Sequence, residues 1–138
     1  MKKFLNLFCL SLCVILMSCG SDCETGFEGD NCDVLSNTKF YGVFTPTDAN
    51  CGSGTSGTAI NRIIIAAHSN GNPTEVTIDV ETSSIFGAID GTIVDGDVSA
   101  SGQWGGAALE IDGNINNDLV FDSVVKGAGF TCDITFEK

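Results

Sequence analysis

The stretch Phe130-Thr131-Cys132-Asp133-Ile134-Thr135-Phe136-Glu137 decides the fold class of this chain. Its apolar and polar residues alternate, which places the apolar side chains on one face of a β-strand and the polar ones on the other. Residues 76–81 repeat the pattern, with Val, Ile and Val against Thr, Asp and Glu. One buried face and one solvated face are typical of antiparallel sheets, so the sequence predicts an all-β fold.

Further segments with strand character follow one another at short intervals. They lie at 39–46, 59–67, 84–89, 92–101, 107–115 and 119–125. Asn70-Gly71, Asp90-Gly91 and Asp95-Gly96 predict tight hairpin turns, whereas Asp112-Gly113 fits either a turn or a bulge within a strand. Residues 126–129, Lys-Gly-Ala-Gly, join the last two strands. Consecutive hairpins predict an antiparallel meander.

A meander with one apolar face buries that face by closing into a small up-and-down barrel or by folding over as a β-sandwich. Cys132 lies on the inward-facing register of the last predicted strand, and Cys51 follows the first one. The first and last strands are neighbours in an up-and-down barrel. We therefore predict the barrel, with a Cys51–Cys132 disulfide at its closing seam, and keep the β-sandwich as the alternative.

The N-terminus has the parts of an export signal. Lys2 and Lys3 precede an apolar run at 4–17. The run is shorter than the roughly 20 apolar residues of a transmembrane helix. An ordinary secretory signal that is cut elsewhere, or an uncleaved anchor, would also fit these residues.

The end of this run, Leu16-Met17-Ser18-Cys19, resembles the lipidation site of bacterial lipoproteins. The resemblance implies cleavage after Ser18 and acyl chains on Cys19, which would attach the protein to the cell envelope. Gly20 stands where an Asp would favour retention at the inner membrane, so the resemblance favours the outer membrane.

The chain has seven cysteines. Cys9 and Cys13 fall inside the signal, and Cys19 is assigned to the lipid. An exported protein meets oxidising conditions, and the four remaining cysteines allow three disulfide pairings. A zinc site is the alternative, but the wide, irregular spacing and the single histidine disfavour it, so we expect no metal or cofactor. The remaining cysteines are Cys23, Cys32, Cys51 and Cys132.

The ten residues Cys23-Glu24-Thr25-Gly26-Phe27-Glu28-Gly29-Asp30-Asn31-Cys32 look like the last loop of an EGF-like domain. This resemblance implies a Cys23–Cys32 disulfide, and the glycines suit a tight reversal with positive φ. The upstream cysteines of a complete EGF-like domain are missing, so calcium binding and receptor recognition are not implied. We interpret the loop as a stiff collar, with a generic turn as the alternative.

We expect three parts in the chain. Residues 1–18 form the signal peptide, residues 19–38 form a linker that contains the EGF-like loop at 23–32, and residues 39–138 form the β-meander domain. Without the signal, 120 residues remain, which suffices for one domain of ordinary size.

The order of features resembles a known family of proteins. An EGF-like loop is followed by Lys39-Phe40-Tyr41-Gly42, by Cys51-Gly52-Ser53-Gly54 and by the terminal Phe130-Thr131-Cys132. This order is similar to that of small cell-envelope lipoproteins of Bacteroidetes-type bacteria with lipocalin-like bodies. The resemblance implies a location and an architecture, and no ligand or active-site residues.

The mature chain is strongly acidic. After the signal is removed, 18 acidic residues face four basic ones, a formal charge of −14. Binding to nucleic acid requires clustered Lys and Arg, so we expect no nucleic-acid partner. Solubility and spacing from a negative cell surface explain the charge without a calcium or cationic partner.

Few residues suggest catalysis. His68 is the only histidine, and no local pattern joins it to a nucleophile and a carboxylate. Asp90, Asp95 and Asp97 could form a carboxylate pair for glycoside chemistry, but two of them begin Asp-Gly turns. We therefore expect no enzyme activity and no catalytic residues.

Two further motifs suggest ligands. Residues 112–119 partly resemble an EF-hand loop, but Asn117 replaces the required Gly and Ser123 the required Glu, so a polar hairpin is favoured. Trp104 lies between glycines and is the one candidate binding residue, as a platform for a sugar, with packing at the barrel rim as the alternative.

Two functions fit this chain. The first is a lipid-anchored, non-enzymatic binding protein that holds a small apolar ligand inside the barrel. The second is a structural or adhesive surface protein with a packed interior, whose loops contact proteins or glycans. A cavity of ~300 Å³ or more would favour the first.

Overall fold

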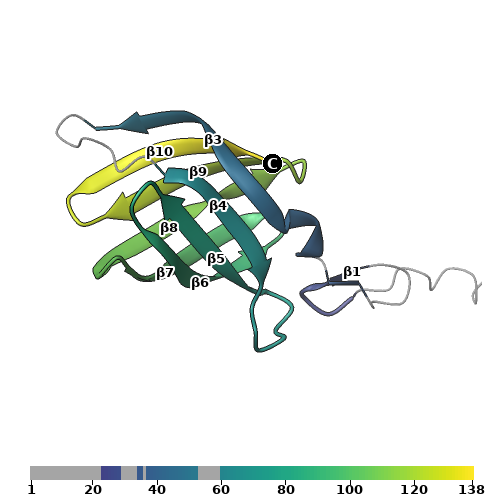
Figure 1. Ribbon diagram of the computed structural model, residues 1–138. Helices are drawn as coiled ribbons and strands as arrows, with labels where there is room; N and C mark the ends of the chain where they lie inside the picture. The colour runs from purple at the N-terminus through teal and green to yellow at the C-terminus, as the bar shows by residue number, and fades with distance from the viewer. Residues whose placement is uncertain (1–22, 29–33, 36, 53–59) are drawn as a thin grey trace, which may run out of the picture.

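The computed structural model describes residues 23–28, 34–35, 37–52 and 60–138 (Figure 1). These ranges form β-strands and turns, with a 3₁₀ turn, η1 (Thr38–Phe40), before the third strand. The strands are β1 (Phe27–Glu28), β2 (Val34–Leu35), β3 (Gly42–Cys51), β4 (Ile60–Ala67), β5 (Glu75–Thr82), β6 (Phe86–Val94), β7 (Asp97–Trp104), β8 (Ala107–Asn116), β9 (Val120–Gly127) and β10 (Phe130–Glu137).

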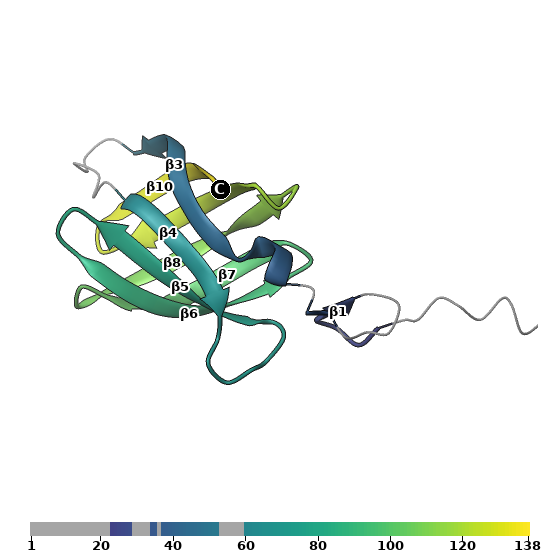
Figure 2. The same ribbon diagram turned by 45° about the vertical axis from the view of Figure 1, so that its right-hand side comes forward.

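Strands β3 to β10 form a closed barrel in which consecutive strands pair antiparallel (Figures 1 and 2). The last strand, β10, pairs with β3 and closes the barrel. The predicted all-β meander and up-and-down barrel are therefore confirmed, and the β-sandwich alternative is excluded. Strands β1 and β2 form a separate two-stranded ladder ahead of the barrel.

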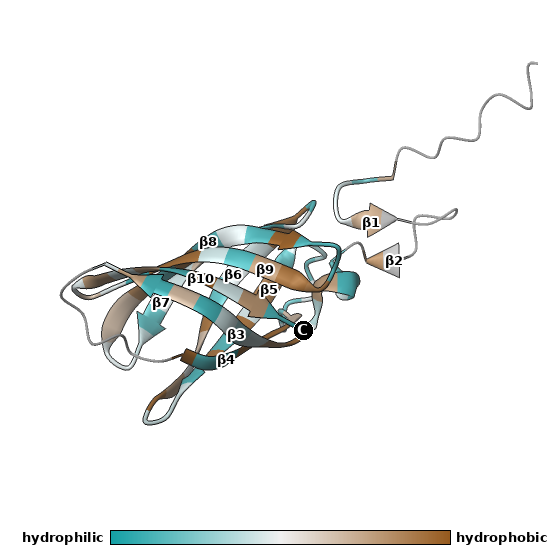
Figure 3. Cartoon of the chain, turned by 90° about the horizontal axis from the view of Figure 1, so that it is seen from above, coloured by the Kyte–Doolittle hydropathy of each residue, from teal (hydrophilic) through white to brown (hydrophobic). Residues whose placement is uncertain are grey.

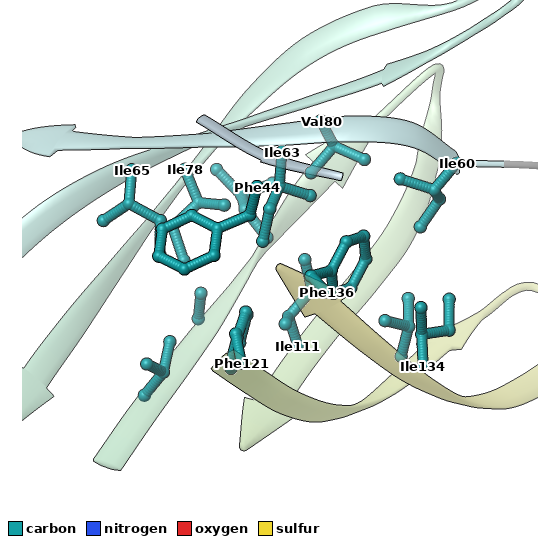
Figure 4. Close-up of a cluster of buried hydrophobic side chains, with 14 of the residues drawn as sticks. Phe44, Ile60, Ile63, Ile65, Ile78, Val80, Ile111, Phe121, Ile134 and Phe136 are labelled. Carbon is teal, nitrogen blue, oxygen red and sulfur yellow. The ribbon is translucent and has the colours of Figure 1, made fainter. Parts of the chain in front are cut away.

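The barrel interior is built by the alternation seen in the sequence. Hydrophilic and hydrophobic residues alternate along the strands in Figure 3, and in β5 every second side chain is buried. These inward side chains gather into one apolar core (Figure 4). Those that are at most 1% exposed are Phe44, Ile63, Ile65, Val76, Ile78, Val80, Ile111, Phe121, Val125 and Phe136.

Three aromatic rings occupy the centre of the core (Figure 4). The ring of Phe121 stacks on that of Phe136, with centroids 6.0 Å apart, and meets the ring of Phe44 edge-on at 6.3 Å. Gly113 on β8 leaves space for the Phe121 ring, because a Cβ atom there would lie 2.8 Å from its Cε2 atom. Large and small inward residues thus complement each other across the barrel.

The closing seam depends on β3, which changes partner along its length. Its first residues, Gly42 to Phe44, pair with β4, and residues 45–51 pair with β10 (Figure 1). Cys51 lies directly opposite Cys132 in this ladder, with 4.1 Å between their Cα atoms, and the two form a disulfide. The predicted Cys51–Cys132 bridge is confirmed.

The structure corrects three predicted strand positions. The strand predicted at 92–101 is divided by the Asp95-Gly96 turn into the end of β6 and the beginning of β7. The strand predicted at 39–46 runs from Gly42 to Cys51, after η1. Asp90-Gly91, predicted as a turn, lies in the middle of β6. Gly91 pairs with Ala100, and a Cβ atom on it would lie 2.6 Å from the Cβ of Ala100. This glycine therefore serves close packing rather than a change of direction.

Asp95-Gly96 forms the turn that its sequence predicts, whereas Asp112-Gly113 does not. Asp95-Gly96 connects β6 and β7 with φ angles of 53° and 92°, as a type I′ turn requires. Residues 112–119, which partly resemble an EF-hand, form the end of β8 and the turn into β9, with Asn117 and Asp118 at φ angles of 52° and 61°. Asp112-Gly113 lies within β8 in a continuous register, so neither a turn nor a bulge forms there.

Substitution of Gly113 by alanine should destabilise the barrel. The new Cβ would overlap the backbone oxygen of Asp122 and lie 2.7 Å from the Cα of Ser123. Because backbone atoms cannot rotate away, we expect a loss of about 1–3 kcal/mol in the free energy of unfolding, measured by urea denaturation. Gly52→Ala is the control, since its Cβ would meet no atom within 4 Å. Equal stability of the two variants would contradict this packing argument.

Candidate functional site

The described side chains fill the centre of the barrel. Side chains from all around the wall meet at its centre, and the three phenylalanine rings occupy the position that a ligand would need (Figure 4). Among the hollows lined entirely by described residues, three stand out, and all three open to solvent. Candidate sites are therefore found on the outside of the barrel and at its ends.

The best-enclosed of these hollows lies where the chain enters the barrel, and we call it the collar pocket. It measures about 340 Å³ and is lined by residues of the barrel end and of the collar. By the collar we mean the described residues 23–28 and 34–35, which lie ahead of the barrel in Figures 1 and 2. Its lining residues are Cys23, Glu24, Thr25, Gly26, Phe27, Lys39, Phe40, Thr74, Ile93, Val94 and Asp95.

The collar contacts the barrel through the loop between β4 and β5. Gly26 has a φ of 97°, and a Cβ atom on it would lie 2.9 Å from the Cβ of Pro73 and 3.1 Å from Cγ2 of Thr74. The missing side chain therefore allows the collar backbone to approach the loop. Cys23 is disulfide-bonded, while Cys32, its predicted partner, lies outside the described residues. The backbone N–H of Phe27 donates to the carbonyl of Glu24 at 3.0 Å, which closes the turn before β1.

The η1 turn forms the floor of the collar pocket. Phe40 is buried at the barrel end, and the Lys39 ammonium lies 5.2 Å from the centre of its ring. The Lys138 ammonium donates to the backbone oxygen of Lys39 at 2.9 Å and so fixes η1 to the end of the chain. Asn37 accepts a 2.9 Å hydrogen bond from the hydroxyl of Tyr41. Burial raises the pKa of Tyr41, while this hydrogen bond opposes the shift.

The loop that carries Thr74 is held by its own polar network. Glu75 accepts hydrogen bonds from the side-chain amides of Asn70, at 2.6 Å, and Asn72, at 2.7 Å. His68 lies beside the same carboxylate, with Nδ1 3.6 Å from Glu75, and its Nε2 is 3.4 Å from Asp90. Nδ1 of His68 accepts a hydrogen bond from the backbone N–H of Asn70 at 3.3 Å, so the imidazole is part of the loop's own hydrogen-bond network.

The structure does not gather the three aspartates that suggested glycoside chemistry. Asp95 lies in the turn between β6 and β7. Asp90 is opposite Ser101 in the β6–β7 ladder and Asp97 is opposite Val94, so they lie at different levels. Asp97 accepts a 2.7 Å hydrogen bond from Asn114, which gives it a structural partner.

Trp104 is buried, so its ring offers no exposed face to a sugar. Its side chain is only 7% exposed, and its indole N–H donates to the carbonyl of Val80 at 3.0 Å. Gly105 and Gly106 have φ angles of 60° and 85°, so these glycines form the turn from β7 to β8 rather than leave the ring accessible. The alternative reading, packing at the barrel rim, fits this burial.

A second hollow, of about 420 Å³, lies on the outer face of β3, β8, β9 and β10 and is rich in aspartate. Several of its carboxylates have partners in neighbouring strands. Ser99 donates to Asp112 at 2.9 Å, and Thr135 donates to Asp122 at 2.8 Å. In the described part of the chain, no group of three or more His, Cys, Asp or Glu residues is arranged to hold a metal ion. The remaining hollow lies over the β8–β9 ladder, near Glu110 and Lys126.

The residues of the collar pocket were missed by sequence reasoning. Lys39, Thr74 and Val94 come from separate parts of the chain, and each looks like an ordinary turn or strand residue. Gly26 was the only local signal, since its place in the EGF-like string indicated a special backbone conformation.

No protein-family model matches this chain, and searches of curated proteins and of solved structures found no significant match. None of the described residues forms a helix that is long and apolar enough to cross a membrane.

Proposed function

We propose that this protein is a lipid-anchored, non-enzymatic binding protein of the bacterial cell envelope, attached through Cys19 to the outer membrane. The basic start and apolar run in residues 1–18, followed by Cys19, support the anchor. The Cys51–Cys132 disulfide supports an oxidising compartment. The EGF-like loop would then space the barrel from the membrane, as in the lipoproteins that the chain resembles.

The packed centre of the barrel supports a partner site on the outside of the protein. Phe44, Phe121 and Phe136 are fully buried, and the ring of Phe121 contacts the other two, so an apolar ligand at this position would have to displace core side chains. We therefore favour the surface role over the ligand carrier. The protein recognises a protein or a glycan with the outside of its barrel, and the collar pocket is the best-formed site for this.

Substitution of Cys19 by alanine should abolish membrane attachment. Acyl chains stabilise membrane binding by about 0.8 kcal/mol per buried methylene, so their loss should release the protein completely. The measurement is incorporation of radiolabelled palmitate in a bacterial host, together with fractionation of membranes. Cys23→Ala is the control, because it removes a collar cysteine and should keep the label. Label on the Cys19→Ala protein, or an intact segment 1–18 in native mass spectrometry, would contradict the anchor.

Titration with palmitate or with the dye 1-anilinonaphthalene-8-sulfonate tests where binding occurs. We expect no saturable binding of one probe per protein, because the barrel has no room for it. One-to-one binding that is lost when inward residues are changed would instead support the carrier of a small apolar ligand.

A further inference from the structure

The collar pocket has the size and enclosure of a site for one small ligand. Its volume of about 340 Å³ falls at the lower end of the range of ligand sites, ~300–1,000 Å³. It is formed at the junction of two separately built units, the disulfide-held collar and the barrel, and such junctions are common places for ligand sites. Its backbone is set on both sides, by the Gly26 contact with the β4–β5 loop and by the Asp95-Gly96 turn.

The charges around the collar pocket exclude several classes of ligand. Glu24 and Asp95 contribute carboxylates, and Lys39 contributes an ammonium group. A phosphorylated ligand requires clustered cationic groups, which two carboxylates would oppose. An acyl chain would have to desolvate the two carboxylates without offering them a hydrogen bond. A compact, uncharged ligand with many hydroxyl groups fits best, because hydroxyls can donate to carboxylates and accept from ammonium.

The apolar part of the collar pocket agrees with this choice. Phe27 is half-buried and lines the pocket together with Ile93 and Val94. An aromatic ring presents a negative face that suits the C–H groups on one side of a sugar ring. Thr74 donates its hydroxyl to Asn72 at 3.1 Å, so its oxygen can still accept a hydrogen bond. Apolar and polar groups thus line the same small cavity.

We propose that the collar pocket binds a neutral saccharide of one or two rings, an inference that rests on the proposed role in surface recognition. The sugar packs a C–H face against Phe27, and its hydroxyls donate to Glu24 and Asp95. The saccharide would be the end of a glycan, because the pocket opens to solvent at the barrel end. Because collar and barrel both contribute to the pocket, binding also fixes the collar against the barrel.

Val94→Trp should abolish saccharide binding while the fold is kept. Val94 lines the collar pocket and is 40% exposed, so a larger side chain can fill the pocket without entering the core. Val43→Trp is the matched control, because Val43 is 45% exposed on β3 and is not among the pocket residues. Full-length acylated protein in detergent micelles is tested by saturation-transfer NMR. The panel contains glucose, galactose, mannose, N-acetylglucosamine, maltose and lactose, with inorganic phosphate, palmitate and trialanine as probes of other classes.

Substitution of the two carboxylates tests their chemistry. Asp95→Asn keeps the positive φ of the turn, since Asn tolerates it, and Glu24→Gln keeps the side-chain length. Each change replaces a charged hydrogen-bond acceptor by a neutral one, so each should weaken saccharide binding by about tenfold. Asp118→Asn, in the β8–β9 turn with a φ of 61° and outside the pocket, should leave the affinity unchanged.

The outcomes separate the saccharide from the wider function. Binding of a sugar that is lost in Val94→Trp and kept in Val43→Trp supports the inference. Sugar binding that persists in Val94→Trp would show that the saccharide binds outside the collar pocket. It would contradict this inference but not the proposed role in surface recognition. The proposal that the pocket binds a saccharide is contradicted if no sugar binds. It is also contradicted if phosphate, palmitate or trialanine binds selectively at the pocket. The palmitate labelling of Cys19 then still tests the anchor independently.

Discussion

The double variant Cys51→Ala/Cys132→Ala should have a free energy of unfolding about 4 kcal/mol lower than that of the native chain. The disulfide closes a loop with a sequence separation of 81, and in the chain-entropy account such a crosslink raises the free energy of the unfolded state by about that amount. Small domains are stable by only about 5–15 kcal/mol, so much of the barrel's stability is removed. The midpoint of thermal unfolding should fall by on the order of 20 °C.

The position of the bridge gives the loss a local part as well. Residues 45–51 of β3 pair with β10. In the described part of the chain, only residues 42–44 of β3 pair with β4. Without the crosslink this half of the seam is held by the β10 ladder and by Thr side chains such as Thr45, which donates to the carbonyl of Glu137. Hydrogen exchange at residues 48–51 should therefore become faster than in β8 and β9.

Calorimetry with and without dithiothreitol measures this effect. The reductant should lower the melting temperature of the native chain and leave that of the double variant nearly unchanged. Cys23→Ala serves as the control, since it removes a disulfide of the collar and leaves the barrel seam intact. A difference of less than about 1 kcal/mol between native chain and double variant would show that the strand pairing alone closes the barrel.

Phe121→Ala lowers the free energy of unfolding by about 3–5 kcal/mol. The side chain is fully buried and contacts both Phe44 and Phe136. The substitution loses the free energy gained by burying the ring. It also leaves a cavity between the two neighbouring rings. Phe121→Leu should cost less, because part of the volume is kept.

Phe86→Ala is the matched control for this substitution. Phe86 begins β6 and is 65% exposed, so its loss should change the stability by no more than about 0.5 kcal/mol. Urea denaturation of the three variants gives the comparison. Similar losses for Phe121→Ala and Phe86→Ala would mean that the interior is loosely filled, and would reopen the case for a ligand inside the barrel.

Most of the fold could be predicted from the sequence, because strand alternation is a local signal. The last strand is an example, since of the four residues predicted to face inward Cys132, Ile134 and Phe136 are buried and Phe130, at the strand's start, is partly buried. The error at Asp90-Gly91 has a non-local cause. An Asp-Gly pair suits a turn, but Gly91 is required by its neighbour Ala100, which lies on the next strand.

The candidate site was less predictable, for two physical reasons. The collar pocket forms from segments that meet only after folding, so nothing local in the sequence joins Lys39 to Val94. Trp104 shows the opposite case, because its flanking glycines indicated accessibility while the carbonyl of Val80 turns the indole inward. The local meaning of a glycine depends on which tertiary contact it serves.

The cystine between β3 and β10 also sets how the molecule responds to mechanical load. A force that enters through the collar reaches the barrel at Gly42, and it can peel β3 only as far as Cys51. The load then passes through the covalent bond to Cys132, bypassing the strands between them. The chain between the two cysteines, about 280 Å long when extended at roughly 3.5 Å per residue, therefore cannot be stretched out while the disulfide is intact. Under shear, the barrel would act as a tether of nearly constant length.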